Sequence, residues 1–95
     1  MAKNKKNKKQ PGNPHLRRAI LEVVENQLRD GTPPETRATL ERLMAEGCTR
    51  DNAIEYIGCV VSAEICDVLN NREPFNEDRY VAALRALPRL PWEKE

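Results

Sequence analysis

Hydrophobic side chains recur at intervals of three and four residues through most of this chain, and this is the spacing of one face of an α-helix. Four stretches follow the pattern and are separated by short segments rich in Gly, Pro and Asn. They predict helices over residues 14–30, 33–46, 50–70 and 77–87. We therefore expect an all-α, compact four-helix domain across residues 13–88.

The third of these helices is the element around which we expect the others to pack. It is apolar on nearly every side. Its broadest stripe consists of Ile54, Ile57, Val61, Ile65, Val68 and Leu69, widened by Ala53, Gly58, Val60 and Ala63. A helix with so wide an apolar surface contacts neighbours on two or three sides. Glycine lowers helix stability by roughly 1 kcal/mol relative to alanine, so Gly58 predicts that another helix crosses closely at that position.

The first two helices are predicted to be amphipathic. In the first helix we expect one face to consist of Leu16, Ile20, Val23, Val24 and Leu28. In the second helix we expect the buried side to consist of Ala38, Leu40, Leu43 and Met44. Polar and charged residues occupy the opposite faces and are expected to lie in solvent.

Capping residues mark where three of the helices begin. Thr49 and Asn76 are suited to the N-cap positions of the third and fourth helices. Phe75, just before its cap, can pack on Tyr80 as a hydrophobic staple. Residues 32–35, Thr-Pro-Pro-Glu, match a capping box at the start of the second helix. Pro34 disfavours helical geometry at Pro33, so the first helical residue of the second helix is expected one later than the box implies.

The last residues, 89–95, are expected to form an extended tail, because Pro88 and Pro91 forbid regular helix. The tail contains Trp92, a large apolar side chain that either folds back on the bundle or docks a partner. We favour folding back, because a lone tryptophan near a terminus has much apolar surface to hide.

Composition agrees with a single small helical domain. The chain has 95 residues, of which 39% are hydrophobic and 33% charged, with one Trp, two Tyr and one Phe. This suits a modest aliphatic core better than a β-sandwich. No stretch of about 18 apolar residues is present for a membrane span, and the first lysines are not followed by the apolar region of a signal peptide. We expect a cytoplasmic protein that does not enter the membrane.

Charge divides the chain into a basic arm and an acidic body. The arm, residues 1–12, contains Lys3, Lys5, Lys6, Lys8 and Lys9, while all fifteen acidic residues follow Pro11. Residues 12–95 therefore carry 11 − 15, or −4. A segment without apolar periodicity does not offset its ordering entropy, so we expect the arm to be disordered. Its lysines can contact nucleic acid or another polyanion; the alternative is a solubilising tail.

The three cysteines share no Cys-x-x-Cys spacing, which is typical of a reduced cytosolic protein. Cys59 and Cys66 lie seven residues apart, or about 10 Å along one helix, and this is too far for a disulfide between them. We interpret both as small buried hydrophobic residues. Cys48, just before the third helix, is the candidate reactive thiol, because a helix start can lower a thiol pKa.

Carboxylates at helical spacing are the candidate metal ligands. Asp51 and Glu55 lie four residues apart in the third helix, and Glu22 and Glu25 lie three apart in the first. Carboxylates that converge from two helices can hold a hard divalent cation, and His15 in the first helix could add a nitrogen ligand. The alternative is that these residues form charged solvent faces, with His15 an exposed polar residue.

The hairpin around Gly47 places two helices about a tight turn, as a helix-turn-helix does. The apolar breadth of its second helix leaves little polar surface to contact base edges in DNA. Short patterns along the domain carry a wider resemblance, among them Pro-Pro-Glu-x-Arg at residues 33–37 and Ala-Ile-x-x-Ile-Gly at residues 53–58. With these the chain resembles a group of small bacterial all-helical proteins of unknown function, and the resemblance implies a fold more than an activity.

Two hypotheses for function follow. The first is a small interaction or regulatory module, without catalytic activity, whose basic arm contacts an acidic protein partner or nucleic acid. The alternative is a metal-binding protein or metal-dependent enzyme that uses carboxylates of the first and third helices. In either case the chain is a monomer, or a homodimer through the exposed edge of the third helix.

Overall fold

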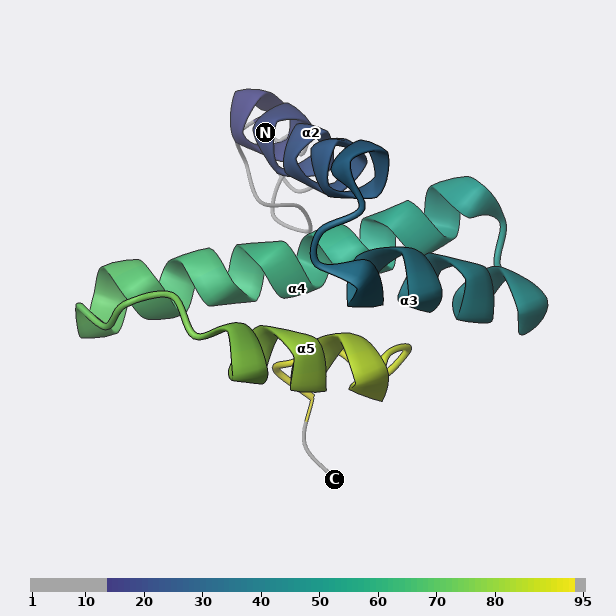
Figure 1. Cartoon of the computed structure of the whole chain (residues 1–95). Coiled ribbons are helices and arrows are strands. Elements are labelled where there is room, and N and C mark those ends of the chain that lie inside the picture. The colour runs from purple at the N-terminus through teal and green to yellow at the C-terminus, as the bar shows by residue number, and fades with distance from the viewer. Residues whose placement is uncertain (1–13, 94–95) are drawn as a thin grey trace, which may run out of the picture.

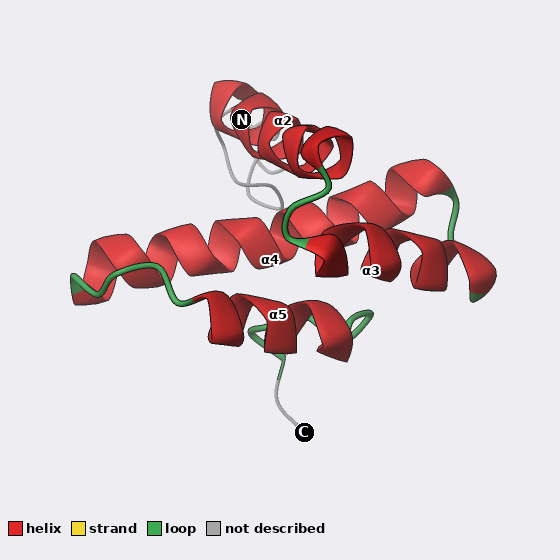
Figure 2. Ribbon diagram, in the orientation of Figure 1, coloured by secondary structure: helices red, strands yellow, loops and turns green. Residues whose placement is uncertain are grey.

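The computed structural model of the chain describes residues 14–93, and these form four α-helices without a strand (Figures 1 and 2). The helices are α2 (Pro14–Asp30), α3 (Pro34–Ala45), α4 (Arg50–Asn71) and α5 (Glu77–Ala86). The all-α prediction is confirmed. The predicted arm lies outside the described residues. Across the described part of the chain, no helix is both long and apolar enough to cross a membrane.

Helix α4 is the centre of the structure, as predicted. Figure 1 shows α2 crossing one side of α4 at a steep angle, while α3 and α5 lie along its other side. The core is formed where the four helices meet. It consists of Ile20, Val24, Leu28, Leu40, Leu43, Ala53, Ile54, Ile57, Val60, Val61, Tyr80, Leu84 and Leu87.

Gly58 marks the point where α2 crosses α4, and the predicted close approach is confirmed. A Cβ atom at Gly58 would lie 3.4 Å from Leu21 Cδ2 and 3.5 Å from Ile20 Cγ2. These are ordinary contact distances for a methyl group, and a longer side chain would collide with α2. The crossing therefore leaves space for one methyl group and little more.

The second half of α4 extends beyond this core, and here the predicted buried stripe is wrong. Ile65 is 37% exposed and Leu69 is 71% exposed, while Val68 is half-buried. The reason is length. Helix α4 has 22 residues, against 12 in α3 and 10 in α5, so its neighbours cannot cover all of it. Figure 1 shows its C-terminal end reaching past the other helices.

The structure confirms the caps of α4 and α5. The Thr49 hydroxyl accepts a hydrogen bond from the Asn52 N–H at 3.1 Å, and the Asn76 side chain accepts one from the Arg79 N–H at 3.0 Å. Phe75 packs against Tyr80 with 5.9 Å between ring centroids, as the predicted staple requires.

The predicted capping box at the start of α3 is wrong. The N-cap of α3 is Pro33, which makes no side-chain cap hydrogen bond. The helix begins one residue later than the box requires, as the effect of Pro34 on Pro33 predicts, and Thr32 therefore lies outside the N-cap position. Two consecutive prolines explain the shift, because each fixes its own φ and restricts the residue before it.

The buried side of α3 also differs from the prediction. Thr36 and Thr39 are buried beside Leu40 and Leu43, whereas Ala38 and Met44 are exposed. Because α3 packs against three other helices, its buried face includes the side occupied by the two threonines. On α2, Leu16 and Val23 are likewise exposed at the edges of the predicted face.

The C-terminal segment turns back on the bundle, so the prediction of an extended tail is wrong. The Arg89 N–H donates to the Ala86 carbonyl at 2.9 Å, and the Glu93 N–H donates to the Leu90 carbonyl at 3.0 Å. Leu90 packs against the core, whereas Trp92 is 58% exposed. The prolines stop the helix but favour turns, and the leucine provides the contact that we expected of Trp92.

We predict that Gly58→Ala will stabilise the fold by up to about 1 kcal/mol, because alanine is the better helix former and its methyl group fits against α2. Gly58→Leu should instead destabilise the fold by about 1–3 kcal/mol, as overpacked cores do. Urea unfolding measures both. A large loss of stability in Gly58→Ala would contradict the described crossing.

Candidate functional site

The five lysines predicted to bind nucleic acid or another polyanion lie outside the described residues, and their assignment stays a prediction. The predicted metal ligands lie on the first half of α2 and the first turns of α4. Residues 14–93 contain no group of three or more His, Cys, Asp or Glu side chains that could hold a metal ion. The structure therefore does not gather Asp51, Glu55, Glu22 and His15 into one site.

Arginines explain why these carboxylates remain apart. Arg17 of α2 forms an ion pair with Glu55 of α4. Arg50 of α4 forms a bidentate pair with Glu25 of α2, with both N···O distances 3.2 Å. The hydrogen bond and the charge of Glu25 raise the pKa of Arg50. These exposed pairs connect α2 to the part of α4 that precedes Gly58.

The three thiols have different environments. Cys48 is half-buried in a hollow of about 590 Å³ that Cys59 and Glu55 also line. The Cys48 N–H donates to the Leu43 carbonyl at 3.0 Å and closes the turn after α3. Cys59 is half-buried, and burial raises the pKa of its thiol. Cys66 is exposed, so the prediction that it is buried is wrong; it lies in the half of α4 that the other helices leave uncovered.

A buried carboxylate, Glu64, is the main polar feature of α4. Glu64 is 6% exposed. Arg79 of α5 contacts it through two hydrogen bonds, from Nε to Oε1 at 3.0 Å and from Nη2 to Oε2 at 2.7 Å. The Asn76 N–H adds a third hydrogen bond to Oε2 at 3.0 Å. Glu64 thus holds the first turn of α5 against α4 through a side chain and a backbone group.

Arg79 also contacts two further carboxylates, Glu73 at 3.3 Å and Asp67 at 3.7 Å. We call Glu64, Asp67, Glu73 and Arg79 the ion cluster. The hydrogen bond from Arg79 lowers the pKa of Glu64, although burial acts in the opposite direction. The pKa of Arg79 is raised, chiefly by its hydrogen bond to Glu64. Glu64 is therefore ionised at neutral pH and its charge is compensated.

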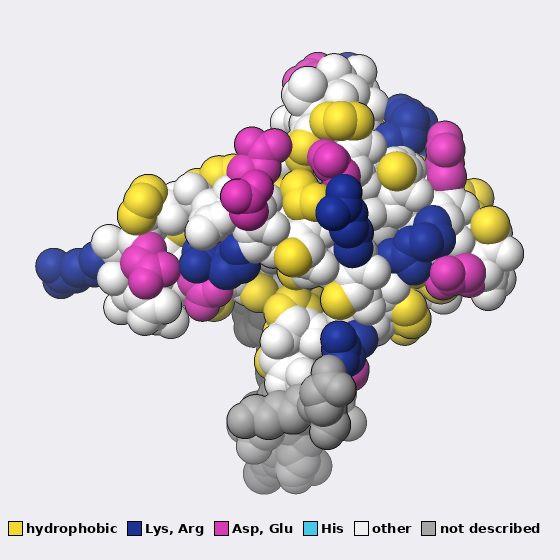
Figure 3. All heavy atoms as spheres, turned by 60° about the horizontal axis from the view of Figure 1, so that its bottom comes forward, with side chains coloured by type: hydrophobic (Ala, Val, Ile, Leu, Met, Phe, Trp, Pro, Cys, Tyr) yellow, Lys and Arg dark blue, Asp and Glu magenta, His cyan; other side chains and the backbone are white. Residues whose placement is uncertain are grey.

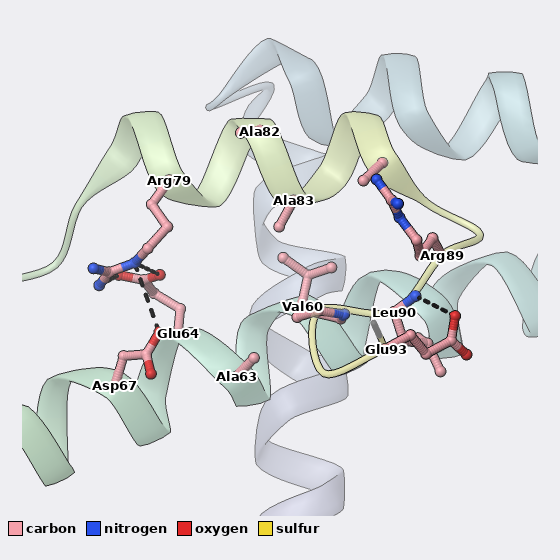
Figure 4. A pocket seen from close by; sticks show the side chains of 12 residues that line it. Val60, Ala63, Glu64, Asp67, Arg79, Ala82, Ala83, Arg89, Leu90 and Glu93 are labelled. Atoms are coloured by element: carbon pink, nitrogen blue, oxygen red, sulfur yellow. Dashed lines mark hydrogen bonds and ion pairs between the residues drawn. The ribbon is translucent and has the colours of Figure 1, made fainter. Parts of the chain in front are cut away.

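Three members of the ion cluster, Glu64, Asp67 and Arg79, line one end of a groove of about 440 Å³ between α4, α5 and the C-terminal turns (Figure 4). Val60 and Ala63 line the groove from α4, and Ala82 and Ala83 line it from α5. At the far end the Glu93 carboxylate accepts a hydrogen bond from the Leu90 N–H at 3.3 Å. Since Glu64 already accepts three hydrogen bonds, this end of the groove holds helices together and does not present a free base.

A second buried polar network connects three helices. The Gln27 Oε1 of α2 accepts hydrogen bonds from the Thr36 hydroxyl of α3 and the Tyr80 hydroxyl of α5, each at 2.8 Å. Thr36 and Tyr80 are both buried, and burial raises the pKa of Tyr80. One amide oxygen therefore accepts hydrogen bonds from two hydroxyl groups in the core.

Gln27 and Tyr80 also border a second groove, which lies beside the uncovered half of α4. We call it the apolar groove. It has a volume of about 340 Å³ and is lined by Val23, Gln27, Val61, Glu64, Ile65, Val68, Leu69, Phe75 and Tyr80. Most of this lining is hydrophobic, and Leu69 and Phe75 are more than half exposed. Of the surfaces built from residues 14–93, this one leaves the most hydrophobic side chains open to a partner.

The face of the molecule shown in Figure 3 carries charges of both signs. Figure 3 shows Lys and Arg side chains intermixed with Asp and Glu over the face that it presents. This arrangement agrees with the helix-to-helix ion pairs described above. On that face, the charged residues do not form a large surface of one sign.

Comparison of the chain with protein-family models, with curated proteins and with solved structures found no match. The resemblance to small bacterial helical proteins therefore stays a prediction. Function has to be argued from the surfaces of the chain itself.

Sequence reasoning missed Glu64, Arg79 and Gln27. The signal for Glu64 was present: it lies seven residues after Ile57 and four after Val60, and so falls within the buried stripe of α4. A carboxylate in that position requires a cation or several hydrogen bonds. The sequence signal for Gln27 was weaker. It lies next to the buried Leu28, but its hydrogen-bond partners belong to other helices and cannot be identified from the sequence.

We predict that Glu64→Gln will destabilise the fold by about 2 kcal/mol at neutral pH, the usual contribution of hydrogen bonds to a charged group. Because the folded-state pKa of Glu64 is lowered from its ordinary 4.5, its stabilisation is present above that pH and is lost as the pH falls through the folded-state pKa. The difference in the free energy of unfolding between the wild type and Glu64→Gln should therefore become smaller as the pH falls. Urea unfolding across the acid range measures it, with the exposed Glu41→Gln as control; a gap independent of pH would contradict the pairing.

Proposed function

We propose that this chain is a non-catalytic interaction module whose N-terminal lysines contact a polyanionic partner, either nucleic acid or an acidic protein. The observation that carries the proposal is the separation of charge between the two parts of the chain. Five lysines precede Pro11, whereas every acidic residue follows it. The proposal places the protein in the cytoplasm, where its three free cysteines stay reduced.

The helical body supports the proposal because many of its arginines are engaged in contacts within the body. Five of the ten arginines in the sequence bind carboxylates or backbone carbonyls of another helix or loop. These are Arg17, Arg37, Arg42, Arg50 and Arg79. An arginine that already pairs with a carboxylate contributes little to binding a phosphate, so the lysines of the arm remain the main group of cations.

The start of α2 extends the basic region. The first acidic residue of the chain is Glu22, and α2 has no acidic residue in its first turn. Helices α3, α4 and α5 each have at least one there. The N-terminus of a helix carries a partial positive charge, so α2 adds to the attraction for an anion beside Arg18.

The buried carboxylate Glu64 has a structural role in this proposal and is not a catalytic base. It binds Arg79 and the Asn76 N–H, and thereby fixes α5 on α4. Its environment lowers the pKa, whereas a general base that works near neutral pH usually needs a raised one. In this proposal the polar groups of the helical body hold the helices together, and the N-terminal arm contacts the partner.

We predict that replacing Lys3, Lys5, Lys6, Lys8 and Lys9 with glutamine will weaken binding to a labelled single-stranded RNA at least about tenfold at low salt. Five lost phosphate contacts should also reduce the slope of log affinity against log salt by about 3.5. Replacing the same lysines with arginine should keep both affinity and slope.

Fluorescence polarisation with the RNA, with duplex DNA and with polyglutamate compares the partner classes. Binding to nucleic acid but not to polyglutamate assigns the arm to nucleic acid, and the reverse result assigns it to acidic proteins. Equal affinities of the wild type and the glutamine variant for all three probes would contradict the proposal.

A further inference from the structure

We propose that the apolar groove docks an amphipathic helix from a partner protein, and that this helix carries basic residues beside its apolar face. This inference goes beyond the proposed function of the N-terminal lysines and does not depend on it. It rests on the shape, the exposure and the surrounding charge of the groove.

The lining of the groove has the chemistry that an amphipathic helix requires. One wall is the uncovered half of α4, where Ile65 and Leu69 lie four residues apart on one face. The other walls are Val23 of α2 and Phe75 before α5. Amphipathic helices bind such grooves with apolar anchors three, four and seven residues apart.

The charges around the groove favour a basic partner. A second hollow, formed by residues 73–78, shares Phe75 with the groove and carries the carboxylates of Glu73, Glu77 and Asp78. No lysine or arginine lines either hollow. Arg79 compensates Glu64 and part of the charge of Glu73, so the carboxylates of Glu77 and Asp78 remain to attract cations.

The same charges argue against a second copy of this chain as the occupant. Two copies that met through this groove would bring their Glu73, Glu77 and Asp78 side chains towards one another, and like charges at an interface are unfavourable. Nor does the N-terminal arm fit, because its only hydrophobic side chains are Met1, Ala2 and Pro11, and these cannot form an apolar helix face. A separate helix with apolar and basic residues satisfies both the groove and its rim.

The test uses the full-length chain labelled with ¹⁵N and two synthetic 18-residue helical peptides. Both peptides carry leucines at i, i+3, i+4 and i+7, and they differ only in having lysines or glutamates at the flanking positions. We expect the lysine peptide to shift the backbone amide signals of residues 61–80 and of Val23. The glutamate peptide should leave those signals unchanged.

Two pairs of variants separate the groove from general attraction. Leu69→Ala should weaken binding of the lysine peptide about tenfold, because it removes much of one apolar side chain from the interface. Met44→Ala, an exposed hydrophobic side chain on α3, should have no effect. Both positions are exposed, so neither variant should unfold the protein.

The second pair tests charge. Glu77→Gln with Asp78→Asn removes two carboxylates from the first turn of α5, and Glu35→Gln with Asp51→Asn removes the same number from the first turns of α3 and α4. Only the α5 pair should weaken the lysine peptide, by about three- to tenfold at low salt.

The proposal is overturned if neither peptide shifts residues 61–80, or if both do so with equal affinity. It is also overturned if the two charge variants behave alike, because binding would then reflect net charge. Sedimentation of the wild type and Leu69→Ala decides the remaining case: a dimer that is lost in Leu69→Ala would assign the groove to a second copy.

Discussion

The packing of α5 depends on one buried carboxylate. Glu64 lies within the apolar stripe of α4, and an unpaired charge in that position would be costly. The ion cluster resolves this cost: Arg79 and the Asn76 N–H satisfy both carboxylate oxygens. Because these two groups belong to the N-cap and first turn of α5, the same contacts fix where that helix begins. Tyr80, one residue later, then reaches Gln27 and connects α5 to α2.

This constraint also explains the uncovered surface. Once the ion cluster fixes the start of α5 beside Glu64, the chain from Arg72 to Phe75 has to return from the end of α4. The last two turns of α4 therefore extend beyond the helices that could bury them, and Leu69 remains exposed. The apolar groove and the carboxylates at its rim are products of the same arrangement. The proposed binding regions thus have opposite chemistry, with lysines before α2 and carboxylates beside the far half of α4.

Much of the fold could be predicted from the sequence because local signals and the helical period agreed. Thr49 and Asn76 cap helices through their own side chains and backbone, and Gly58 marked a helix crossing. What failed depended on contacts between distant segments. The helical periodicity of α4 places Ile65 and Leu69 in the same predicted buried stripe as Ile57. Which of these residues is covered depends on the lengths of the neighbouring helices. Likewise, Thr36 is buried because Gln27 and Tyr80 approach it from other helices.

The candidate sites also divide into features set by the local sequence and features set by contacts between distant segments. The predicted carboxylate ligands do not form a group of three or more within residues 14–93, and two carboxylates of this region, Glu55 and Glu25, pair with Arg17 and Arg50 of the facing helix. Glu64 could have been found from its place in the stripe, but its partner fifteen residues later could not, since the intervening turn sets their approach. The apolar groove is likewise a consequence of tertiary packing. The lysine arm is the opposite case, because its charge is a property of composition alone.

The most direct test of this account is a double-mutant cycle on the ion cluster, measured by urea unfolding at neutral pH. Arg79→Gln leaves the Glu64 charge buried without its main partner, and Glu64→Gln removes that charge. If the pair organises α5, the double variant should be at least as stable as Arg79→Gln alone, because the glutamine no longer requires a cation. Losses of stability that simply add in the double variant would contradict the account.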